Sequence, residues 1–542
     1  MPDLPEHFNA ATFFVDRHVT EGRGARTAFR FRGRSITYAE VATSVDRVAA
    51  GLASLGVEIE NRVVLVLRDT PAFGASFWGT VKLGAVVVPL NTLMGDPEYE
   101  FILNDSRAKV AIVEEDFAPR FAALRARCPW LRAVVVVTVA GAVGAGAASL
   151  ASTAGGLIKK PGAADPAVLA LDDLLSTAPA PAADTFREDI MYWGYTSGST
   201  GKPKAAVHAH RDLVAAAERV GVGIFGIGPE DLTFSASKMF FAFGLGNSLY
   251  FPALVGAASV LAPERIEPEL AFETIARERP TIFFTVPTLY ARMLEVPDAG
   301  RRFDLGSLRF CVSSGEALPP AIFDAWQDRF KLELVDVLGS TELLHDFIAN
   351  RPGEARRGSA GRLVPGFEAR LVDDAGATVP DGAVGHLLVK GPTAAPYYWN
   401  RLERTQTTML GEWIRTGDVL SRDADGFFSF HGRSDDMLRV GGLWVSPAEI
   451  EARLSEHPAV LEAGVVGRRD SDGLTRPCAS VVLKAGHQGG AALEAELRAC
   501  LRDGLAGFKV PRWIEFVEEL PKTATGKVQR FRLRTRPPEE SG

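Results

Sequence analysis

The sequence contains few of the features that mark secreted, membrane-bound or nucleic-acid-binding proteins. Its four cysteines, in 542 residues, lie far apart and form no paired motif, which favours a reducing cytoplasm over a disulfide framework. The 60 lysines and arginines are outnumbered by 67 aspartates and glutamates, and the net charge is −7. The chain therefore offers no basic field for nucleic acid and no polybasic patch for a membrane. The first ten residues, MPDLPEHFNA, also lack the pattern of a signal peptide.

Long hydrophobic runs are also scarce. The stretch 133–158 carries no charge, but only its AVVVVTV part is strongly apolar, and the rest is alanine, glycine, serine and threonine with few large side chains. We interpret it as a buried strand followed by a flexible Ala/Gly-rich insertion that continues to about Asp184, rather than as a membrane span. The remaining composition is that of an ordinary globular protein, and the length predicts two or more domains.

The string YTSGSTGKPK, at Tyr195–Lys204, has the composition of a loop that binds phosphate. Its glycines leave backbone N–H groups free to point at an anion, while its hydroxyl groups and lysines add donors and positive charge. It is not a Walker loop, because Thr196 stands where that loop needs glycine and Pro203 follows the Gly-Lys pair. A strand at Ile190–Tyr195 and a helix at His210–Ile224 are expected to flank it. The expected phosphate-binding residues are Thr196, Ser197, Gly198, Ser199, Thr200, Gly201 and Lys202.

Five further motifs follow along the chain. They are SSGEALP, DVLGSTE, WIRTGD, GRSDDMLRVGG and PKTATGK, which begin at Ser313, Asp336, Trp413, Gly432 and Pro521. With the phosphate loop, these motifs resemble those of the adenylate-forming superfamily, which contains acyl-CoA synthetases, peptide-synthetase adenylation domains and firefly-type luciferases. The resemblance covers the chain from about Phe8 to Arg534. It implies that the protein uses ATP to convert a carboxylic acid into its acyl adenylate.

The resemblance assigns the reaction to a small set of residues. Lys527 is expected to bridge the substrate carboxylate and the α-phosphate during adenylation, which suits a compact ammonium on a flexible stem. Thr341 is expected to touch the α-phosphate, and Glu342 to hold Mg²⁺, a cation that prefers carboxylate and phosphate oxygens. Asp418 is expected to accept both ribose hydroxyls, and Arg433 to contact ribose or phosphate.

The resemblance also implies where the adenine lies and how the chain divides. The residues expected to wall the adenine are Gly315, Glu316, Ala317, Asp336, Val337 and Leu338. Residues 1–434 are expected to form the domain that binds AMP and the acyl group, and 435–542 a mobile domain that carries the catalytic lysine. Asp435 falls at the pivot between them. Gly442 is expected to line the tunnel for the pantetheine arm, where a side chain would block the arm.

The sequence pattern predicts an α/β fold. Helical and strand patterns alternate through the first 365 residues, which indicates parallel or mixed sheets covered by helices. Turn signals then multiply between short strands, which predicts a β-rich subdomain before the end of the large domain. A small α+β piece follows Asp435. We therefore expect a large N-terminal domain of helix-covered mixed sheets with a β-rich subdomain, and a small, mobile α+β C-terminal domain.

Three segments resemble benzoate–CoA ligases and their close relatives. They are FNAATFFVDRHV near the start, KMFFAFGLGNSLYFP at Lys238–Pro252, and STELLHDFIANRPG from Ser340. The resemblance implies a flat apolar slot suited to an aryl ring. Its expected lining residues are Phe241, Ala242, Phe243, Gly244, Gly339 and His345.

Asp346 departs from this pattern, because an apolar residue is expected after the histidine of the LLH segment. If its side chain faces the slot, it can accept a hydrogen bond from an amino or hydroxyl group on the ring. If it faces away, it is a solvated or capping acid, and this is the interpretation that we favour. Benzoate, 2-aminobenzoate and the hydroxybenzoates therefore all remain candidate substrates.

The acceptor of the acyl group is expected to be CoA. No fused carrier domain with a DSL-type serine site follows Lys527, although a separate carrier protein remains an alternative acceptor. A non-catalytic aryl-acid-binding protein would be expected to have lost Lys527, Glu342 or Asp418, and all three are present. A luciferase-like oxidation of the adenylate is a further alternative. The expected partners are an aromatic acid, ATP with Mg²⁺, and CoA, bound by a cytoplasmic monomer or homodimer.

Overall fold

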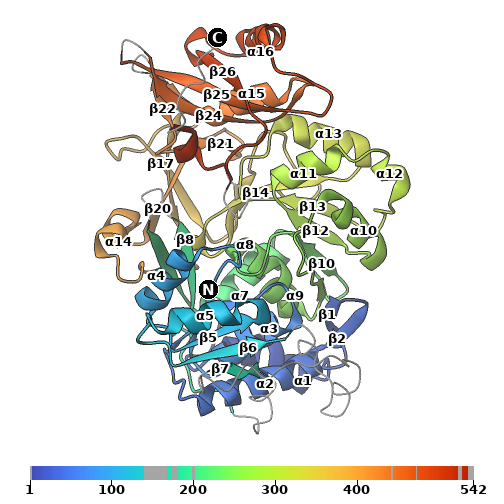
Figure 1. Ribbon diagram of the computed structural model, residues 1–542, viewed down its shortest axis with the longest axis vertical. Coiled ribbons are helices and arrows are strands. Elements are labelled where there is room, and N and C mark those ends of the chain that lie inside the picture. The colour runs from blue at the N-terminus through green and yellow to red at the C-terminus, as the bar shows by residue number, and fades with distance from the viewer. Residues whose placement is uncertain are drawn as a thin grey trace.

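The computed structural model describes residues 3–138, 168–171, 181–197, 202–440, 443–470, 473–522 and 528–534. Within these ranges, two large mixed sheets and an antiparallel sheet form the main body of the molecule. Figure 1 shows the C-terminal segment (red) at the end of the molecule opposite the N-terminal helices and strands (blue). The predicted fold class, α/β with a small α+β piece at the C-terminus, is confirmed.

The first sheet has the strand order β7-β6-β5-β3-β4-β8-β9 in the described residues. Neighbouring strands are parallel except β8 and β9, which form an antiparallel pair. The strands are β3 (Arg62–Val66), β4 (Val86–Pro89), β5 (Val110–Glu114), β6 (Ala133–Val137), β7 (Val168–Ala170), β8 (Ile190–Ser197) and β9 (Pro203–Ala209).

Strand β7 corrects part of the sequence prediction. The stretch up to about Asp184 was expected to be a flexible insertion, but Val168–Ala170 pairs in parallel with β6, and Leu171 beside it is buried. Residues 139–167 and 172–180 of the same stretch lie outside the described residues. The preceding strand β6 is buried as predicted.

The second sheet has the order β16-β15-β14-β13-β12-β10-β11-β1-β2 over the described chain. Its central strands are parallel, and antiparallel strands complete both edges. The strands are β1 (Thr27–Phe31), β2 (Arg34–Thr37), β10 (Leu232–Ser235), β11 (Ala258–Val260), β12 (Ile282–Thr285), β13 (Phe310–Ser313), β14 (Leu334–Gly339), β15 (Asp346–Ala349) and β16 (Arg362–Leu363).

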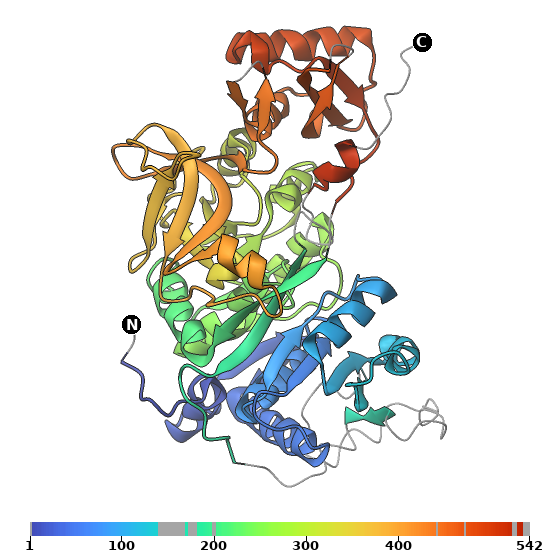
Figure 2. The ribbon, with the colours of Figure 1, turned by 90° about the vertical axis from the view of Figure 1, so that its left-hand side faces the viewer.

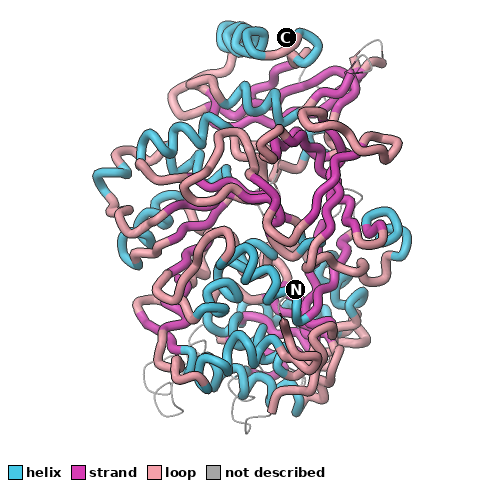
Figure 3. The backbone as a smooth tube through the Cα atoms, turned by 180° about the vertical axis from the view of Figure 1, so that it is seen from behind, coloured by secondary structure: helices cyan, strands magenta, loops and turns pink. Residues whose placement is uncertain are grey.

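Helices cover both sheets, as Figure 3 shows in cyan around the magenta strands. In β3, Val63 and Leu65 enter the core shared with α2 and α3, whereas Val64 and Val66 enter a second core with α4 and α5, because successive strand residues face opposite sides. The helices are α1 (Arg17–Thr20), α2 (Tyr38–Ser54), α3 (Pro71–Lys82), α4 (Asp96–Ser106), α5 (Ala118–Arg125), α7 (His210–Ala216), α8 (Ala242–Leu245), α9 (Phe251–Val255), α10 (Pro268–Glu278), α11 (Pro287–Leu294), α12 (Ala299–Arg302) and α13 (Pro320–Phe330).

The helical segments that follow the phosphate string join the two sheets into one core. Helix α7 continues as the π-helix η3 (Ala217–Val222), and α8 continues as the π-helix η4 (Gly246–Tyr250). Buried side chains from these segments contact residues of both sheets in a single hydrophobic cluster. The same core holds Tyr192 of β8 and Ala206 of β9 together with residues of β13 and β14, which carry two of the other motifs.

The predicted β-rich subdomain is an antiparallel sheet (Figure 2, orange). It contains α14 (Leu402–Thr408) beside β17 (Glu368–Val372), β18 (Val384–Lys390), β19 (Met409–Leu410), β20 (Trp413–Arg422) and β21 (Phe428–Arg433). The C-terminal segment comprises β22 (Leu438–Val440), β23 (Leu443–Val445), α15 (Pro447–Ser455), β24 (Val460–Arg469), β25 (Thr475–Leu483), α16 (Ala491–Gly504), β26 (Trp513–Phe516) and α17 (Arg530–Arg534).

Ion pairs form within the C-terminal segment and between this segment and the body of the molecule. Nζ of Lys484 lies 3.3 Å from Oε1 of Glu295 at the end of α11. Arg534 of α17 donates to the carbonyl of Asp435 (3.1 Å) and to the carboxylate of Asp436 (2.7 Å), so α17 rests against the predicted pivot. No helix in the described part of the chain is long and apolar enough to cross a membrane.

Candidate functional site

The phosphate string begins on β8, as the sequence predicts, and ends on β9, a strand that was not predicted. Tyr195, its first residue, donates its hydroxyl hydrogen to Oδ2 of Asp105 (2.8 Å), at the C-terminal end of α4. Arg401 donates to Oδ1 of the same carboxylate (3.0 Å), and the indole of Trp399 donates to the Asp105 carbonyl (2.8 Å). We call Asp105, Tyr195, Trp399 and Arg401 the Asp105 clamp. It fixes the start of the loop, because one buried carboxylate holds two donors from distant segments.

The structure describes only part of the loop itself. Gly198, Ser199, Thr200 and Gly201 lie outside the described residues, and Ser197 is described as the last residue of β8. Thr196 pairs with Lys204 in the β8–β9 ladder. The ammonium of Lys202 is exposed and lies 5.9 Å from the ring centre of Phe101.

Lys204, which closes the string, contacts Glu342 from the second sheet. Its ammonium lies 3.3 Å from Oε1 of Glu342 and donates to the hydroxyl of Tyr398 (2.5 Å). The Tyr398 hydroxyl in turn donates to the same Glu342 oxygen (2.5 Å). Burial would raise the pKa of Glu342, but the Lys204 charge and the Tyr398 hydroxyl together hold this pKa below its usual value. Glu342 is thus held as an anion beside the phosphate string.

Thr341, next to Glu342, lies directly against the strand that leads into the loop. A Cβ atom built at Gly194 would lie 2.4 Å from the methyl carbon of Thr341, so only glycine allows β8 to pass here. The ring of His208 in β9 contacts the Thr341 carbonyl through Nε2 (2.8 Å). The structure therefore brings three predicted sites, the phosphate string, Thr341 and Glu342, into one place.

Asp418 and Arg433 form a second charged pair on neighbouring strands. They face each other across the β20–β21 ladder, and Nη1 of Arg433 lies 2.8 Å from Oδ1 of Asp418. Only 4% of Asp418 is exposed, and the Asp418 charge raises the pKa of the arginine. Arg433 also donates to the carbonyl of Thr416 (2.9 Å). Arg433 therefore orients the Asp418 carboxylate, which can accept hydrogen bonds from hydroxyl groups.

Two segments were predicted to contact the adenine, and they lie at β13 and β14, which are neighbouring parallel strands. Gly315 has φ of +92°, which favours glycine, and lies just past the end of β13. Glu316 accepts a hydrogen bond from the Thr288 hydroxyl (2.9 Å). Burial raises the pKa of Asp336 on β14 well above its usual value, and the Asp346 carboxylate adds to this effect. Ala317 is exposed, and Val337 and Leu338 continue β14.

The segment Lys238–Pro252, which was predicted to contribute to the acyl slot, contacts His345 beyond the carboxyl end of β14. Nε2 of His345 contacts the Phe243 carbonyl (3.2 Å), and the centres of the two rings are 5.5 Å apart. A Cβ atom at Gly246 would lie 2.5 Å from the His345 ring. A Cβ atom at Gly244 would lie 2.2 Å from the Lys238 carbonyl, so both glycines permit close packing. The structure thus brings together Phe243 and His345, which are 102 residues apart.

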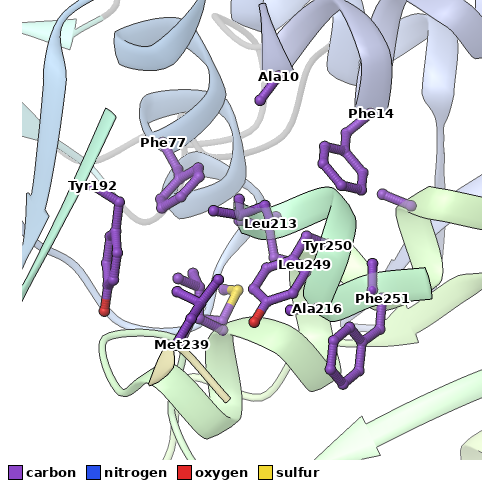
Figure 4. Packing of buried hydrophobic residues seen from close by; sticks show 14 of the residues in the cluster. Ala10, Phe14, Phe77, Tyr192, Leu213, Ala216, Met239, Leu249, Tyr250 and Phe251 are labelled. Carbon is purple, nitrogen blue, oxygen red and sulfur yellow. The ribbon is translucent and has the colours of Figure 1, made fainter. Parts of the chain in front are cut away.

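Apolar and aromatic side chains surround this segment. Figure 4 shows the hydroxyl groups of Tyr192 and Tyr250 on the side of the core where Met239 lies. Phe241 packs edge-on against Phe240, at 4.6 Å between ring centres, and both of these rings are only partly buried. Ala242 begins helix α8. The environment is therefore apolar, with a few hydroxyl and imidazole groups at defined places.

A strained turn aims His345 and Asp346. Leu344 has φ of +67° and ψ of −42°, and the His345 N–H donates to the Leu343 carbonyl (2.8 Å), which defines a γ-turn with positive φ. Such a turn is rare for a residue with a side chain and is found where the surrounding structure fixes it. Asp346, which follows, is 2% exposed and pairs with Gly339 in the β14–β15 ladder. The interpretation of Asp346 as a solvated acid is therefore wrong.

Several residues of the site could not be identified from its motifs. Tyr398 and Asp105 contact Lys204 and Tyr195 but lie outside every motif quoted above, whereas Lys204 stands in the string itself. Two predicted residues, Lys527 and Gly442, fall outside the described residues, so their positions stay predictions. Asp435 lies beside Arg433, with 4.0 Å between its Oδ1 and the arginine Nε.

Comparison with known proteins agrees with this arrangement. The AMP-binding enzyme family matches residues 15–399, and the AMP-binding enzyme C-terminal domain matches residues 449–527. The chain therefore belongs to the AMP-binding enzyme family, and the adenylate-forming superfamily expected from the motifs is confirmed.

Individual relatives point to one part of that family. The chain is 44% identical over 536 residues to the benzoate–CoA ligase of Thauera aromatica, with 98% of this chain and 97% of the relative covered. It is 42% identical to the anthranilate CoA ligase AuaEII, solved in complex with anthranoyl-AMP, with a TM-score of 0.90 and coverage of 98% and 97%. A benzoate CoA ligase from Burkholderia xenovorans LB400 gives 40% identity, a TM-score of 0.85, and coverage of 97% and 100%.

Proposed function

We propose that the protein is an ATP-dependent aryl-CoA ligase. It adenylates an aromatic carboxylate, benzoate or a substituted benzoate, and transfers the acyl group to CoA, with release of pyrophosphate and AMP. The observation that carries the proposal is the convergence of Glu342, Lys204 and Thr341 on the end of the phosphate string. The similarity to benzoate and anthranilate CoA ligases over nearly the whole chain supports the choice of acid and acceptor.

The first half-reaction needs alignment and charge rather than covalent catalysis. A carboxylate oxygen attacks the α-phosphorus of ATP, the bond to the β-phosphate oxygen breaks, and pyrophosphate leaves with that electron pair. Backbone N–H groups of the loop and the lysines near it stabilise the charge that develops on the phosphate oxygens. Asp418 holds the ribose, so the α-phosphorus meets the acid in line. Lys527 is the group assigned to the attacking carboxylate.

Glu342 is the residue that would hold Mg²⁺. Its anionic state and partial exposure, 16% of the side chain, fit a hard cation, and Lys204 and Tyr398 both contact its Oε1 atom. No cluster of three or more acidic, histidine or cysteine ligands occurs in the ranges described, so the phosphates and water would complete the coordination. This is the usual arrangement for Mg²⁺ in nucleotide sites, where the ion neutralises phosphate charge.

The second half-reaction transfers the acyl group from AMP to a thiol. The sulfur of CoA attacks the acyl carbon, and AMP leaves with the electrons of the anhydride bond. A swing of residues 435–542 about Asp435 would remove Lys527 and open the thiol tunnel past Gly442. A carrier-protein pantetheine offers the same thiol and is the alternative acceptor.

A panel of acids tests the proposal through AMP release with ATP, Mg²⁺ and CoA. The panel holds benzoate, 2-aminobenzoate, 3- and 4-hydroxybenzoate, cinnamate, cyclohexanecarboxylate and octanoate. Turnover centred on the benzoates supports an aryl-CoA ligase, whereas a preference for octanoate or cinnamate contradicts the aryl slot. Acid-dependent pyrophosphate exchange without CoA-dependent AMP release would identify a carrier protein as the acceptor.

Replacing Glu342 by glutamine is expected to raise the Mg²⁺ concentration that gives half-maximal rate and to lower the adenylation rate roughly 10- to 100-fold. The substitution keeps the shape of the side chain but removes the charge that binds the metal. Pyrophosphate exchange over a Mg²⁺ titration measures both effects. Glu114→Gln is the matched control, since Glu114 is also buried and paired with a cation, Arg68, outside the site. An unaltered Mg²⁺ requirement in Glu342→Gln would contradict the assignment.

Replacing Asp418 by asparagine is expected to raise the KM for ATP roughly 10- to 100-fold, because a charged acceptor for the ribose hydroxyls is lost. The preference for ATP over 3′-deoxy-ATP should fall in the same variant, while the KM for the acid changes little. Steady-state kinetics with both nucleotides measure this. Asp423→Asn, at the turn that follows β20 and paired with Arg356, should behave like the unmodified protein. Equal discrimination between the nucleotides in Asp418→Asn would exclude a ribose contact.

A further inference from the structure

The buried carboxylate of Asp346 has too few hydrogen-bond donors. An ionised carboxylate accepts about four hydrogen bonds when fully satisfied. Oδ1 of Asp346 accepts one, from the Ser314 hydroxyl, at 3.2 Å. Oδ2 has no hydrogen-bond partner in the described parts of the chain. A buried carboxylate oxygen without a hydrogen bond is costly, so a site with this arrangement calls for a further donor.

The neighbouring polar groups do not supply it. Nδ1 of His345 lies 2.9 Å from Oδ2 of Asp346, but neither atom has a hydrogen-bond partner in the described residues. The hydroxyl of Tyr250 is fully buried and also has no hydrogen-bond partner among the residues described. Burial raises the pKa of Tyr250 well above its usual value, and the Asp346 charge adds to this, so the hydroxyl stays protonated.

Both groups lie beside residues of the predicted acyl slot, although neither was predicted to line it. A Cβ atom at Gly339 would lie 2.6 Å from Oδ1 of Asp346, so the carboxylate covers the face of β14 where that glycine has no side chain. A Cβ atom at Gly246 would lie 3.0 Å from the Tyr250 hydroxyl and 2.5 Å from the His345 ring. Gly339 is itself partly exposed, whereas the Asp346 side chain beside it is buried.

The chain also fixes which end of the slot the carboxylate occupies. Gly339 precedes Thr341 by two residues, which separates their α-carbons by about 7 Å at most. Thr341 is the residue assigned to the α-phosphate, to which the acid becomes joined. Asp346 therefore lies near the end of the ring that bears the carboxylate, and not at its far end.

We propose that Asp346 selects benzoates that carry a hydrogen-bond donor, an amino or hydroxyl group, next to the carboxylate. The donor supplies the hydrogen bond that Oδ2 lacks, while plain benzoate leaves the buried charge unsatisfied. This inference rests on the proposed function and names the substrate class of the same site. Discrimination by one hydrogen bond to a charged acceptor amounts to roughly 10- to 100-fold in kcat/KM.

The test compares kcat/KM for 2-aminobenzoate, 2-hydroxybenzoate, 4-aminobenzoate and benzoate by AMP release with ATP, Mg²⁺ and CoA. The expected result is a preference of about 10-fold or more for the two 2-substituted acids over benzoate, and little gain for 4-aminobenzoate. Asp346→Leu should bring the ratio of 2-aminobenzoate to benzoate to about 1 or below, since the donor then loses its acceptor. Asp346→Asn, which keeps the shape and one acceptor, should lie between the two.

A matched control separates selection from general damage. Asp212 is a buried aspartate beside a histidine, with its Oδ2 3.4 Å from Nδ1 of His208, and it caps α7. Asp212→Asn should keep the substrate ratio of the unmodified protein even if its overall rate falls. If Asp346→Leu does not fold, the ratio in Asp346→Asn still decides the matter.

The outcomes distinguish this inference from the proposed function. The inference would be overturned if kcat/KM for benzoate equalled that for 2-aminobenzoate. It would also be overturned if the preference for 2-aminobenzoate survived in both Asp346 variants. Either result would leave the proposed ligase activity intact. A gain confined to 4-aminobenzoate would overturn the placement of Asp346 at the carboxylate end. Absence of AMP release and of pyrophosphate exchange with every acid would overturn the proposed function, and this inference with it.

Discussion

Replacing Lys527 by alanine is expected to slow acid-dependent adenylation roughly 100- to 1,000-fold. The lysine is the group assigned to hold the attacking carboxylate against the α-phosphate, and alanine removes both its charge and its reach. Binding of ATP should change little, because the phosphate string, Asp418 and Arg433 are intact. The measurement is pyrophosphate exchange with the preferred acid, together with the KM for ATP.

The half-reactions give this prediction an internal control. Lys527→Ala should still form the thioester from CoA and a chemically prepared acyl adenylate, because the lysine acts before the thiol binds. Lys522→Ala is the matched variant, since Lys522 is the other lysine of the PKTATGK motif but is paired with Glu462 at 2.7 Å. It should keep the adenylation rate. An equal loss in the two lysine variants, or an equal loss in both half-reactions, would show that Lys527 acts on the fold rather than on the first step.

Replacing Gly442 by tryptophan should have the opposite effect on the two steps. The bulky side chain would fill the tunnel assigned to the pantetheine arm, and the transfer of the acyl group to CoA should fall by roughly 100-fold or more. Adenylation precedes thiol binding, so pyrophosphate exchange should stay close to that of the unmodified protein. The acyl adenylate should then accumulate on the enzyme, and rapid quenching with chromatography measures it directly.

Gly507 provides the control for Gly442. It lies exposed in the same C-terminal segment, and a Cβ atom there would meet no atom within 4 Å. Gly507→Trp adds the same side chain without blocking the proposed tunnel, so thioester formation should continue. If Gly442→Trp formed thioester at the normal rate, the thiol would have to enter by another route.

The motifs predicted the charged groups of the site better than their partners. Glu342 and Asp418 could be assigned because each stands at a fixed place in a short motif, and the structure brings Glu342 to the phosphate string. Tyr398 could not, since it reaches Glu342 across 56 residues of chain and its role depends on how the β-rich subdomain packs. Asp105 likewise meets Tyr195 only because the end of α4 lies beside β8.

The local sequence pattern also failed to predict two features that tertiary contacts determine, strand β7 and the orientation of Asp346. Strand β7 has three residues and sits in a stretch rich in alanine and glycine, so its periodicity carries no signal, and pairing with β6 defines it. The side on which Asp346 lies depends on the positive φ of Leu344, a conformation that the sequence does not favour for leucine. Buried strands such as β3 and β5 alternate with helices such as α3, in agreement with the alternation predicted for the first 365 residues.

The Asp105 clamp matters for anyone who recombines this enzyme with its relatives. Its members come from three stretches of the chain, at Asp105, at Tyr195 and at Trp399 with Arg401, yet they act on the first residue of one loop. A crossover placed between these stretches would join an aspartate from one parent to a tyrosine or arginine position from the other. Libraries of hybrid ligases should therefore inherit all three stretches from a single parent, and vary the acyl slot between them.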